Sequence, residues 1–159
     1  MDRFEEFGIL EEKKRNYEGI LYVTNLIHGV LEKRFHSYFA ARGTSAPKYN
    51  ILMALAYING GEGLNQSEIG RHLITSPGNV TKLVDSLCRD GYATRRQSKS
   101  DRRENIVKIT KKGADFIEAL WPEYDAMARK YADLIPQKKQ KAFIETLKAW
   151  YLAIEADAE

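Results

Sequence analysis

Residues 64–91 read LNQSEIGRHLITSPGNVTKLVDSLCRDG, and they predict two short helices joined by a tight turn. The first helix begins with a capping box, because Asn65 can act as its N-cap and Glu68 follows three residues later. Its apolar side is formed by Ile69, His72 and Leu73. The second helix begins with Ser76 as N-cap and with Pro77 in the first helical position, where the missing N–H of proline does no harm.

The second helix has two faces of different chemistry. Apolar residues recur every three or four positions and are expected to face the core: Val80, Leu83, Val84 and Leu87. The residues on the opposite face and along its flanks are small, polar or charged: Gly78, Asn79, Thr81, Lys82, Asp85 and Arg89. The helix is expected to end at Asp90, because Gly91 suits the left-handed conformation of a C-cap.

The outward face is suited to contact with a nucleic acid. Gly78 permits close approach, Asn79 can form two hydrogen bonds with adenine, and Lys82 can reach guanine or a phosphate. The positive end of the helix dipole also favours a phosphate nearby. Asp85 does not suit base contacts, and we expect it to pair with Arg89, four residues further along.

After the second helix, the periodicity becomes that of β-strands. Residues 92–96 and 105–109 predict two short strands, and residues 97–104 form a polar, basic tip between them. Arg95 and Arg96 alternate across the first strand, so only one of them can face a given partner. Two short helices followed by a basic hairpin are typical of a winged helix-turn-helix.

Long amphipathic helices flank this region. Residues 11–41 predict a helix of roughly 45 Å, and residues 47–59 predict a shorter one. Thr110 is expected to cap a further long helix that ends near Asp133, and a final helix runs through Ile154. The first and last helices carry more apolar surface than one subunit can cover, which predicts an obligate homodimer.

The charge of the chain is unevenly distributed. The net charge is +3, but residues 71–112 contain eleven Lys and Arg against four Asp and Glu, a local charge of +7. The remaining residues contain fourteen against eighteen, a charge of −4. This polarity fits a polyanionic partner on one face, and on charge alone it fits a solvated basic loop equally well.

Length and composition exclude several classes of protein. The chain has 159 residues, 43% of them hydrophobic, and one cysteine, which predicts a folded protein without a disulfide framework or a cysteine-rich zinc site. We find no apolar run of membrane length and no signal-peptide pattern, so we expect a cytoplasmic protein. The sequence has no nucleophile elbow and no glycine-rich phosphate loop, and its three histidines are scattered. We therefore expect no enzyme, no cofactor and no metal site.

Residues 64–85 resemble the helix-turn-helix of the MarR family of bacterial transcription regulators. The hairpin strengthens this resemblance, because residues 101–113, DRRENIVKITKKG, are similar to the family signature D-x-R-x-x-x-V-x-L-T-x-x-G, with Ile109 in place of leucine. The resemblance covers nearly the whole chain, including the long first helix and the two long C-terminal helices.

The resemblance implies a mainly α-helical fold with a small β-wing. It implies an N-terminal helical dimerisation region at 1–45, a winged helix-turn-helix DNA-binding domain at 46–112 and C-terminal dimerisation helices at 113–159. The homodimer would bind double-stranded DNA at a pseudo-palindromic site. In each subunit the second helix would enter the major groove with Ser76, Pro77, Gly78, Asn79, Thr81 and Lys82. The wing would contribute Asp101, Arg102, Arg103 and Arg96, with Arg103 in the minor groove and Asp101 holding it in place.

The resemblance further implies a repressor that is relieved by a small anionic or phenolic effector, bound between the dimerisation and DNA-binding parts. Candidate pocket residues are Tyr17, Tyr22, His28 and Tyr38, although tyrosines on apolar helical faces are more often core or interface residues. Two other functions stay open: an architectural protein that coats DNA without sequence preference, and a metal- or redox-sensing regulator of the same fold. We expect Cys88 to be a partly buried, inert thiol.

Overall fold

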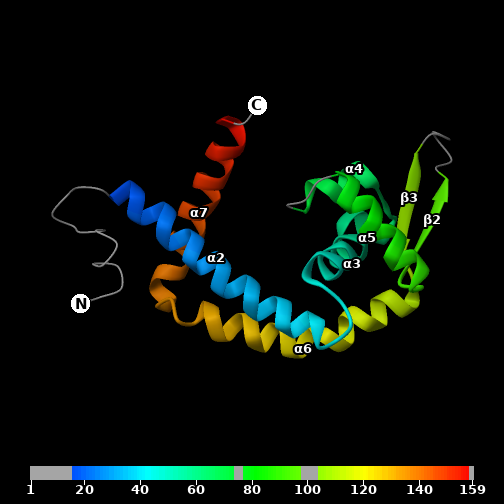
Figure 1. Ribbon diagram of the computed structural model, residues 1–159, viewed down its shortest axis with the longest axis horizontal. Helices are drawn as coiled ribbons and strands as arrows, with labels where there is room; N and C mark the ends of the chain where they lie inside the picture. Colours follow the sequence, from blue (N-terminus) through cyan, green and yellow to red (C-terminus); the bar gives the residue numbers. More distant parts are fainter. Residues whose placement is uncertain (1–15, 74–76, 98–103, 158–159) are drawn as a thin grey trace.

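The computed structural model describes residues 16–73, 77–97 and 104–157 (Figure 1). In chain order its elements are α2 (Asn16–Ala40), α3 (Ala46–Tyr57), the 3-10 helix η2 (Ile58–Gly61), β1 (Leu64–Asn65), α4 (Gln66–Arg71), α5 (Pro77–Arg89), β2 (Ala93–Gln97), β3 (Asn105–Ile109), α6 (Lys111–Ala132) and α7 (Gln137–Asp157). The predicted fold class, mainly α with a small β-wing, is confirmed. No helix within these ranges is long and apolar enough to cross a membrane.

Helices α4 and α6 begin at the caps that the sequence predicts, and Gly91 follows α5 as predicted. The Asn65 side chain accepts a hydrogen bond from the Glu68 amide at 2.8 Å, and the Glu68 carboxylate accepts one from the Asn65 amide at 2.7 Å. At the start of α6 the Thr110 hydroxyl accepts a hydrogen bond from the Gly113 amide at 3.0 Å. Gly91, after α5, has a φ of +76°. The local patterns therefore predict these boundaries correctly.

The wing is part of a three-stranded antiparallel sheet with the order β1–β3–β2. Strands β2 and β3 pair along their whole lengths. Strand β1 is not evident from the sequence, because its two residues are too few to show an alternating pattern. It can approach β3 because the preceding Gly63 has a φ of +98° and no side chain. A Cβ on Gly63 would come within 2.7 Å of the Ile106 side chain.

The hydrophobic core surrounds α3, which contacts α5, α6 and β3. The Tyr49 ring of α3 packs against Phe39 of α2 and Tyr124 of α6, with ring centroids 5.0 and 5.1 Å apart. One prediction about the core is wrong: His72 is exposed, although the sequence places it on an apolar face. The reason is that α4 ends at Arg71, so that His72 is the C-cap and no longer follows the helical stripe.

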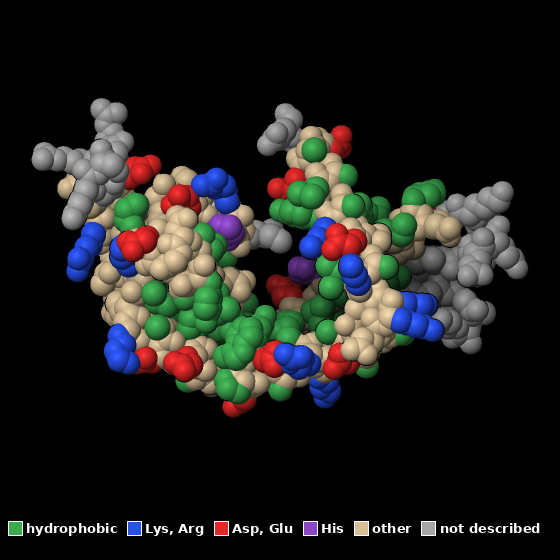
Figure 2. Space-filling model, turned by 180° about the vertical axis from the view of Figure 1, so that it is seen from behind, with side chains coloured by type: hydrophobic (Ala, Val, Ile, Leu, Met, Phe, Trp, Pro, Cys, Tyr) green, Lys and Arg blue, Asp and Glu red, His purple; other side chains and the backbone are tan. Residues whose placement is uncertain are grey.

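The elements form two parts that are joined by the bowed helix α6 (Figure 1). The winged helix, from α3 to β3, lies at one end, and the N-terminal half of α2 lies with α7 at the other. A hollow separates the two parts in the space-filling view (Figure 2).

None of the described residues of α7 is buried, and Phe39 is the buried residue of α2. Large apolar side chains are exposed on these two helices: Tyr17, Ile20, Leu21, Ile27, Val30, Phe143, Ile144, Leu147, Tyr151, Leu152 and Ile154.

Candidate nucleic-acid interface

Helix α5 separates a buried apolar side from an exposed polar side, as predicted. The buried side carries Val80, Val84 and Leu87, with Leu83 packed partly buried against the same core. The exposed side carries Gly78, Asn79 and Lys82. Thr81 is half-buried between the two sides, and Pro77 is the first residue of the helix. The polar surface of α5 is therefore available to a partner over the N-terminal half of the helix.

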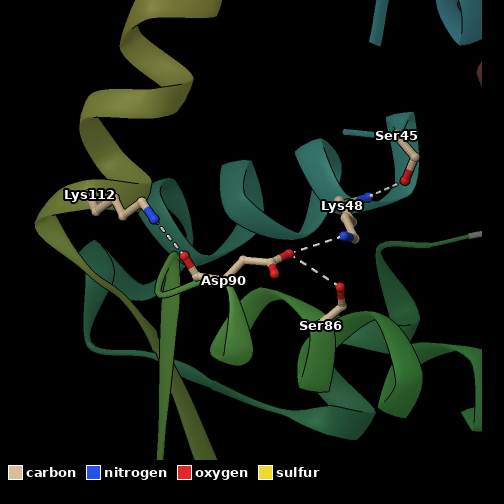
Figure 3. A network of polar contacts seen from close by, with 5 residues as sticks. All are labelled: Ser45, Lys48, Ser86, Asp90 and Lys112. Carbon is tan, nitrogen blue, oxygen red and sulfur yellow. Dashed lines mark hydrogen bonds and ion pairs between the residues drawn. The ribbon is translucent and has the colours of Figure 1, made fainter. Parts of the chain in front are cut away.

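The C-terminal end of α5 is held by polar contacts around Asp90 (Figure 3). The Asp90 carboxylate accepts hydrogen bonds from the Lys48 ammonium and the Ser86 hydroxyl, each at 3.3 Å. The Lys112 ammonium donates to the Asp90 backbone carbonyl at 2.7 Å. Lys48 also donates through its amide to Ser45, the N-cap of α3. These contacts join the end of α5 to the first turns of α3 and α6.

The hairpin is tied to α5 by an ion pair between Arg95 and Asp85, in which the Arg95 Nη2 and Asp85 Oδ1 atoms are 2.8 Å apart. Arg95 lies opposite the buried Val107 in the β2–β3 register, so its side chain is on the face of the sheet that packs toward α5. The predicted pairing of Asp85 with Arg89 is therefore wrong, because helical spacing takes no account of a neighbouring strand. Arg96 lies on the other face of β2 and is exposed.

Four of the predicted site residues lie outside the described residues: Ser76, Asp101, Arg102 and Arg103. Their contacts with DNA stay predictions. Helix α5, which carries the other predicted residues of the recognition helix, packs against β2, whereas the Arg96 side chain lies on the face of β2 that is turned away from α5.

Cys88 lies on α5 and is half-buried. Burial raises the pKa of its thiol, and this effect outweighs the opposing influence of the nearby Arg95 cation. Because the thiolate is the reactive form of cysteine, a raised pKa lowers reactivity at neutral pH. Both observations agree with the prediction of a partly buried, inert thiol.

A groove of about 340 Å³ lies between α2, α3 and α6. Most of its lining is apolar, and the lining residues are His28, Leu31, Glu32, Phe35, Phe39, Ala46, Asn50 and Tyr124. Of the four predicted pocket residues, His28 lines this groove, whereas Tyr17, Tyr22 and Tyr38 do not. The Tyr38 hydroxyl instead donates to the Leu120 carbonyl at 2.8 Å. The described residues include no cluster of side chains able to hold a metal ion.

Sequence reasoning misses several residues of this groove. Asn50 and Tyr124 belong to α3 and α6, and they meet α2 only in the folded chain, so no local pattern marks them. Glu32 has a local signal, since it follows His28 by one helical turn and lies 3.8 Å from its imidazole. Phe35 belongs to the apolar stripe of the first helix, which identifies a core position but not a groove.

Residues 43–104 match the sequence model of the MarR family. The uncharacterized HTH-type transcriptional regulator YkoM of Bacillus subtilis is 30% identical over 99 residues, which are 62% of this chain and 63% of YkoM. The HTH-type transcriptional repressor YetL of the same species is 31% identical over 100 residues, or 60% of this chain and 59% of YetL. The matching region of the chain thus spans about three fifths of the length of these relatives.

Among solved structures, the complex of S. aureus MepR with DNA has a similar fold. Its TM-score is 0.75 at 18% sequence identity, and the match covers 84% of this chain and 96% of the MepR chain. At this identity the likeness shows a shared fold. Residues 43–104, which hold the helix-turn-helix and the strands that precede the wing tip, thus match the MarR family of transcription regulators, and the described part of the chain shares its fold with MepR.

Proposed function

We propose that the protein is a dimeric, sequence-specific regulator of transcription that binds double-stranded DNA in the cytoplasm. The observation that carries this proposal is the exposed side of α5, where Gly78, Asn79 and Lys82 lie opposite a buried apolar side. The major groove of B-DNA is about 12 Å wide and admits an α-helix of this kind. The match of residues 43–104 to the MarR family and the names of the relatives YkoM and YetL support the same function.

In the proposed complex α5 lies in the major groove with its N-terminal residues toward the base edges. Asn79 would pair with adenine, and Lys82 would contact guanine or a phosphate. Arg96, which is exposed on β2, would contact the DNA backbone. Arg103 at the wing tip would enter the adjacent minor groove, where negative potential is enhanced, and Asp101 would orient it.

The proposal includes a homodimer, with regions 1–45 and 113–159 for dimerisation and region 46–112 for DNA binding. Leu147 and Tyr151, one turn apart on α7, are 40% and 52% exposed. A second copy of the chain would cover this surface, since large obligate interfaces resemble a divided core. Two copies of α5 would then lie roughly 34 Å apart, one turn of the duplex, and the site would be pseudo-palindromic.

We further propose that the protein is a repressor, and that a small anionic or phenolic effector relieves repression. The groove lies between α2 and the winged helix, so a ligand in it would contact both parts. Its rings Phe35, Phe39 and Tyr124 suit an aromatic compound. Repression is supported by the name of YetL, a transcriptional repressor.

Protection of the DNA beside the protein's own gene tests this proposal. We expect one protected pseudo-palindromic site, and we expect a phenolic carboxylate such as salicylate to weaken the protection. Uniform protection along the fragment would instead indicate an architectural protein. If neither this DNA nor any member of a random-sequence library is retained by the protein, DNA binding itself is wrong.

A further inference from the structure

Helix α6 contains a proline where the winged helix meets the dimerisation helices. The buried residues of this fully described helix, Gly113, Ile117 and Leu120, all precede Pro122, and Ile117 and Leu120 belong to the core of the winged helix. Pro122 has no N–H, so the Glu118 carbonyl cannot receive the helical hydrogen bond that would normally come from that position. The backbone of α6 is therefore less constrained at this turn than elsewhere in the bowed helix (Figure 1).

A side chain of α2 contacts the backbone of α6 within the same turn. The Tyr38 hydroxyl donates to the Leu120 carbonyl at 2.8 Å. This hydrogen bond joins the end of α2 to α6 two residues before Pro122. Burial is the main effect on Tyr38 and raises the pKa of its hydroxyl, so the hydroxyl stays protonated and able to donate.

Arg42, in the connection after α2, stabilises the contact between Tyr38 and α6. Its guanidinium lies 3.9 Å above the centroid of the Tyr38 ring and donates to the Tyr38 backbone carbonyl at 2.9 Å. It also forms an ion pair with Glu123, the residue that follows the proline. We call Tyr38, Arg42 and Glu123 the α6 clamp, because they connect the end of α2 to α6 on both sides of Pro122.

We propose that the α6 clamp sets the angle between the winged helix and the dimerisation helices, and thereby the half-site spacing that the dimer accepts on DNA. This inference rests on the dimeric DNA-binding function proposed above. Lys111, at the start of α6, lies about 16 Å from Pro122 at about 1.5 Å per residue. A change of about 20° in the bend would move that end by about 6 Å, close to two base-pair steps of about 3.4 Å. A dimer that selects one spacing needs this angle to be held.

Distances between the two winged helices of one dimer test the inference in the absence of DNA. Cys88→Ser removes the native thiol, and Arg89→Cys places a nitroxide label at the exposed end of α5. Double electron–electron resonance then measures the separation of the two labels. We expect one narrow distribution in this labelled parent, and a broader distribution with a shifted maximum after Arg42→Gln or Glu123→Gln.

Arg129→Gln is the matched control, because it removes a 2.7 Å ion pair between Arg129 and Asp125 that lies within α6 alone. We expect the Arg129→Gln variant to give the same distribution of label–label distances as the labelled parent. An unchanged distribution after Arg42→Gln and Glu123→Gln would overturn the inference, and so would equal broadening in the control. If the labelled parent gives no distance at all, the proposed dimer is wrong, and the inference falls with it.

A spacing series on DNA provides a second measurement. Palindromic duplexes are built from the half-site found by protection, with its natural spacing and with one or two base pairs added. We expect Arg42→Gln to reduce the affinity ratio between the natural and the longer spacings toward one, while it keeps the discrimination between base variants within the half-site. Equal weakening at every spacing would show a merely structural role and overturn the inference.

Discussion

The Arg95 guanidinium of β2 lies 2.8 Å from the Asp85 carboxylate of α5, so that the wing strand is fastened to the outward side of the proposed recognition helix. The two side chains are 29% and 46% exposed. A pair that is this open to solvent contributes only about 0–1 kcal/mol to stability. Its larger consequence concerns charge, because Asp85 neutralises the Arg95 cation beside the proposed DNA-binding helix.

Two substitutions in this pair should change DNA affinity in opposite directions. Asp85→Asn frees the Arg95 cation, so binding to unrelated DNA should strengthen, and the log–log salt slope should steepen by about 1 per subunit. Arg95→Gln leaves the Asp85 carboxylate unpaired near the phosphates, so binding should weaken. Fluorescence anisotropy with one arbitrary duplex at several salt concentrations measures both effects. Changes of the same sign in both variants would contradict the charge argument.

Lys82→Ala should reduce both affinity and sequence discrimination, because Lys82 is exposed on the proposed major-groove side of α5. A lost bidentate base contact corresponds to about 1–3 kcal/mol. Affinities for operator variants at fixed salt measure the loss. Lys130→Ala is the control, since it removes the same charge from an exposed position of α6. An equal loss of DNA affinity in both variants would show that Lys82 contributes only its positive charge.

Arg103→Ala should weaken binding chiefly at sites whose minor groove is narrow under the wing, with the base preference of α5 intact. Asp101→Ala should act in the same direction but more mildly, because it removes the group that orients Arg103. Affinities for duplexes with A-tract or G·C-rich flanks measure this effect. Thermal stability should hardly change in either variant. If Arg103→Ala binds every duplex as the unsubstituted protein does, Arg103 is a solvated loop residue.

Leu147→Glu should convert the protein to monomers or leave it unfolded, since Leu147 lies in the exposed apolar stripe of α7. A carboxylate buried in an apolar interface without a partner is strongly unfavourable. Light scattering at micromolar concentration measures the mass. Lys141→Glu, at an exposed position of the same helix, should keep the dimer. A monomer mass for the unsubstituted protein would refute the dimer directly.

At neutral pH the Tyr49→Phe variant should be as stable as the unsubstituted protein, or more stable by up to about 1 kcal/mol. The Tyr49 hydroxyl is buried, and among the described residues it has no hydrogen-bond partner. Burial also raises the pKa of Tyr49 to about 12. Because the folded-state pKa lies above the unfolded value of about 10, this group does not change stability with pH below about 10, and stability falls as the pH rises from about 10 to about 12.

Denaturant unfolding between pH 8 and 12 checks this prediction. The decline in stability above pH 10 should be shallower in Tyr49→Phe than in the unsubstituted protein. Tyr38→Phe is the contrasting variant, because it deletes a hydroxyl that donates to Leu120 and should lower stability at neutral pH by about 1 kcal/mol. Destabilisation of Tyr49→Phe at neutral pH would show that its hydroxyl is satisfied.

The boundaries of most elements were predictable because their determinants are local. Asn65 and Glu68 cap α4 from within one helical turn, and Thr110 begins α6 in the same way. The strand at 105–109 has the predicted bounds, since three of its five residues are β-branched and favour a strand. The exposed side of α5 follows as well, because a buried stripe on one side of a helix defines the opposite side.

The partners of these side chains, by contrast, were decided by the tertiary structure. Tyr38 reaches the carbonyl of Leu120, which is 82 residues away in the chain. Asp85 pairs with Arg95 rather than with a residue on its own helix because β2 lies closer to it. These contacts depend on the angle at which α2 crosses α6 and on how β2 lies against α5. Close packing of side chains from all the elements together sets those angles, and no local pattern of residues contains them.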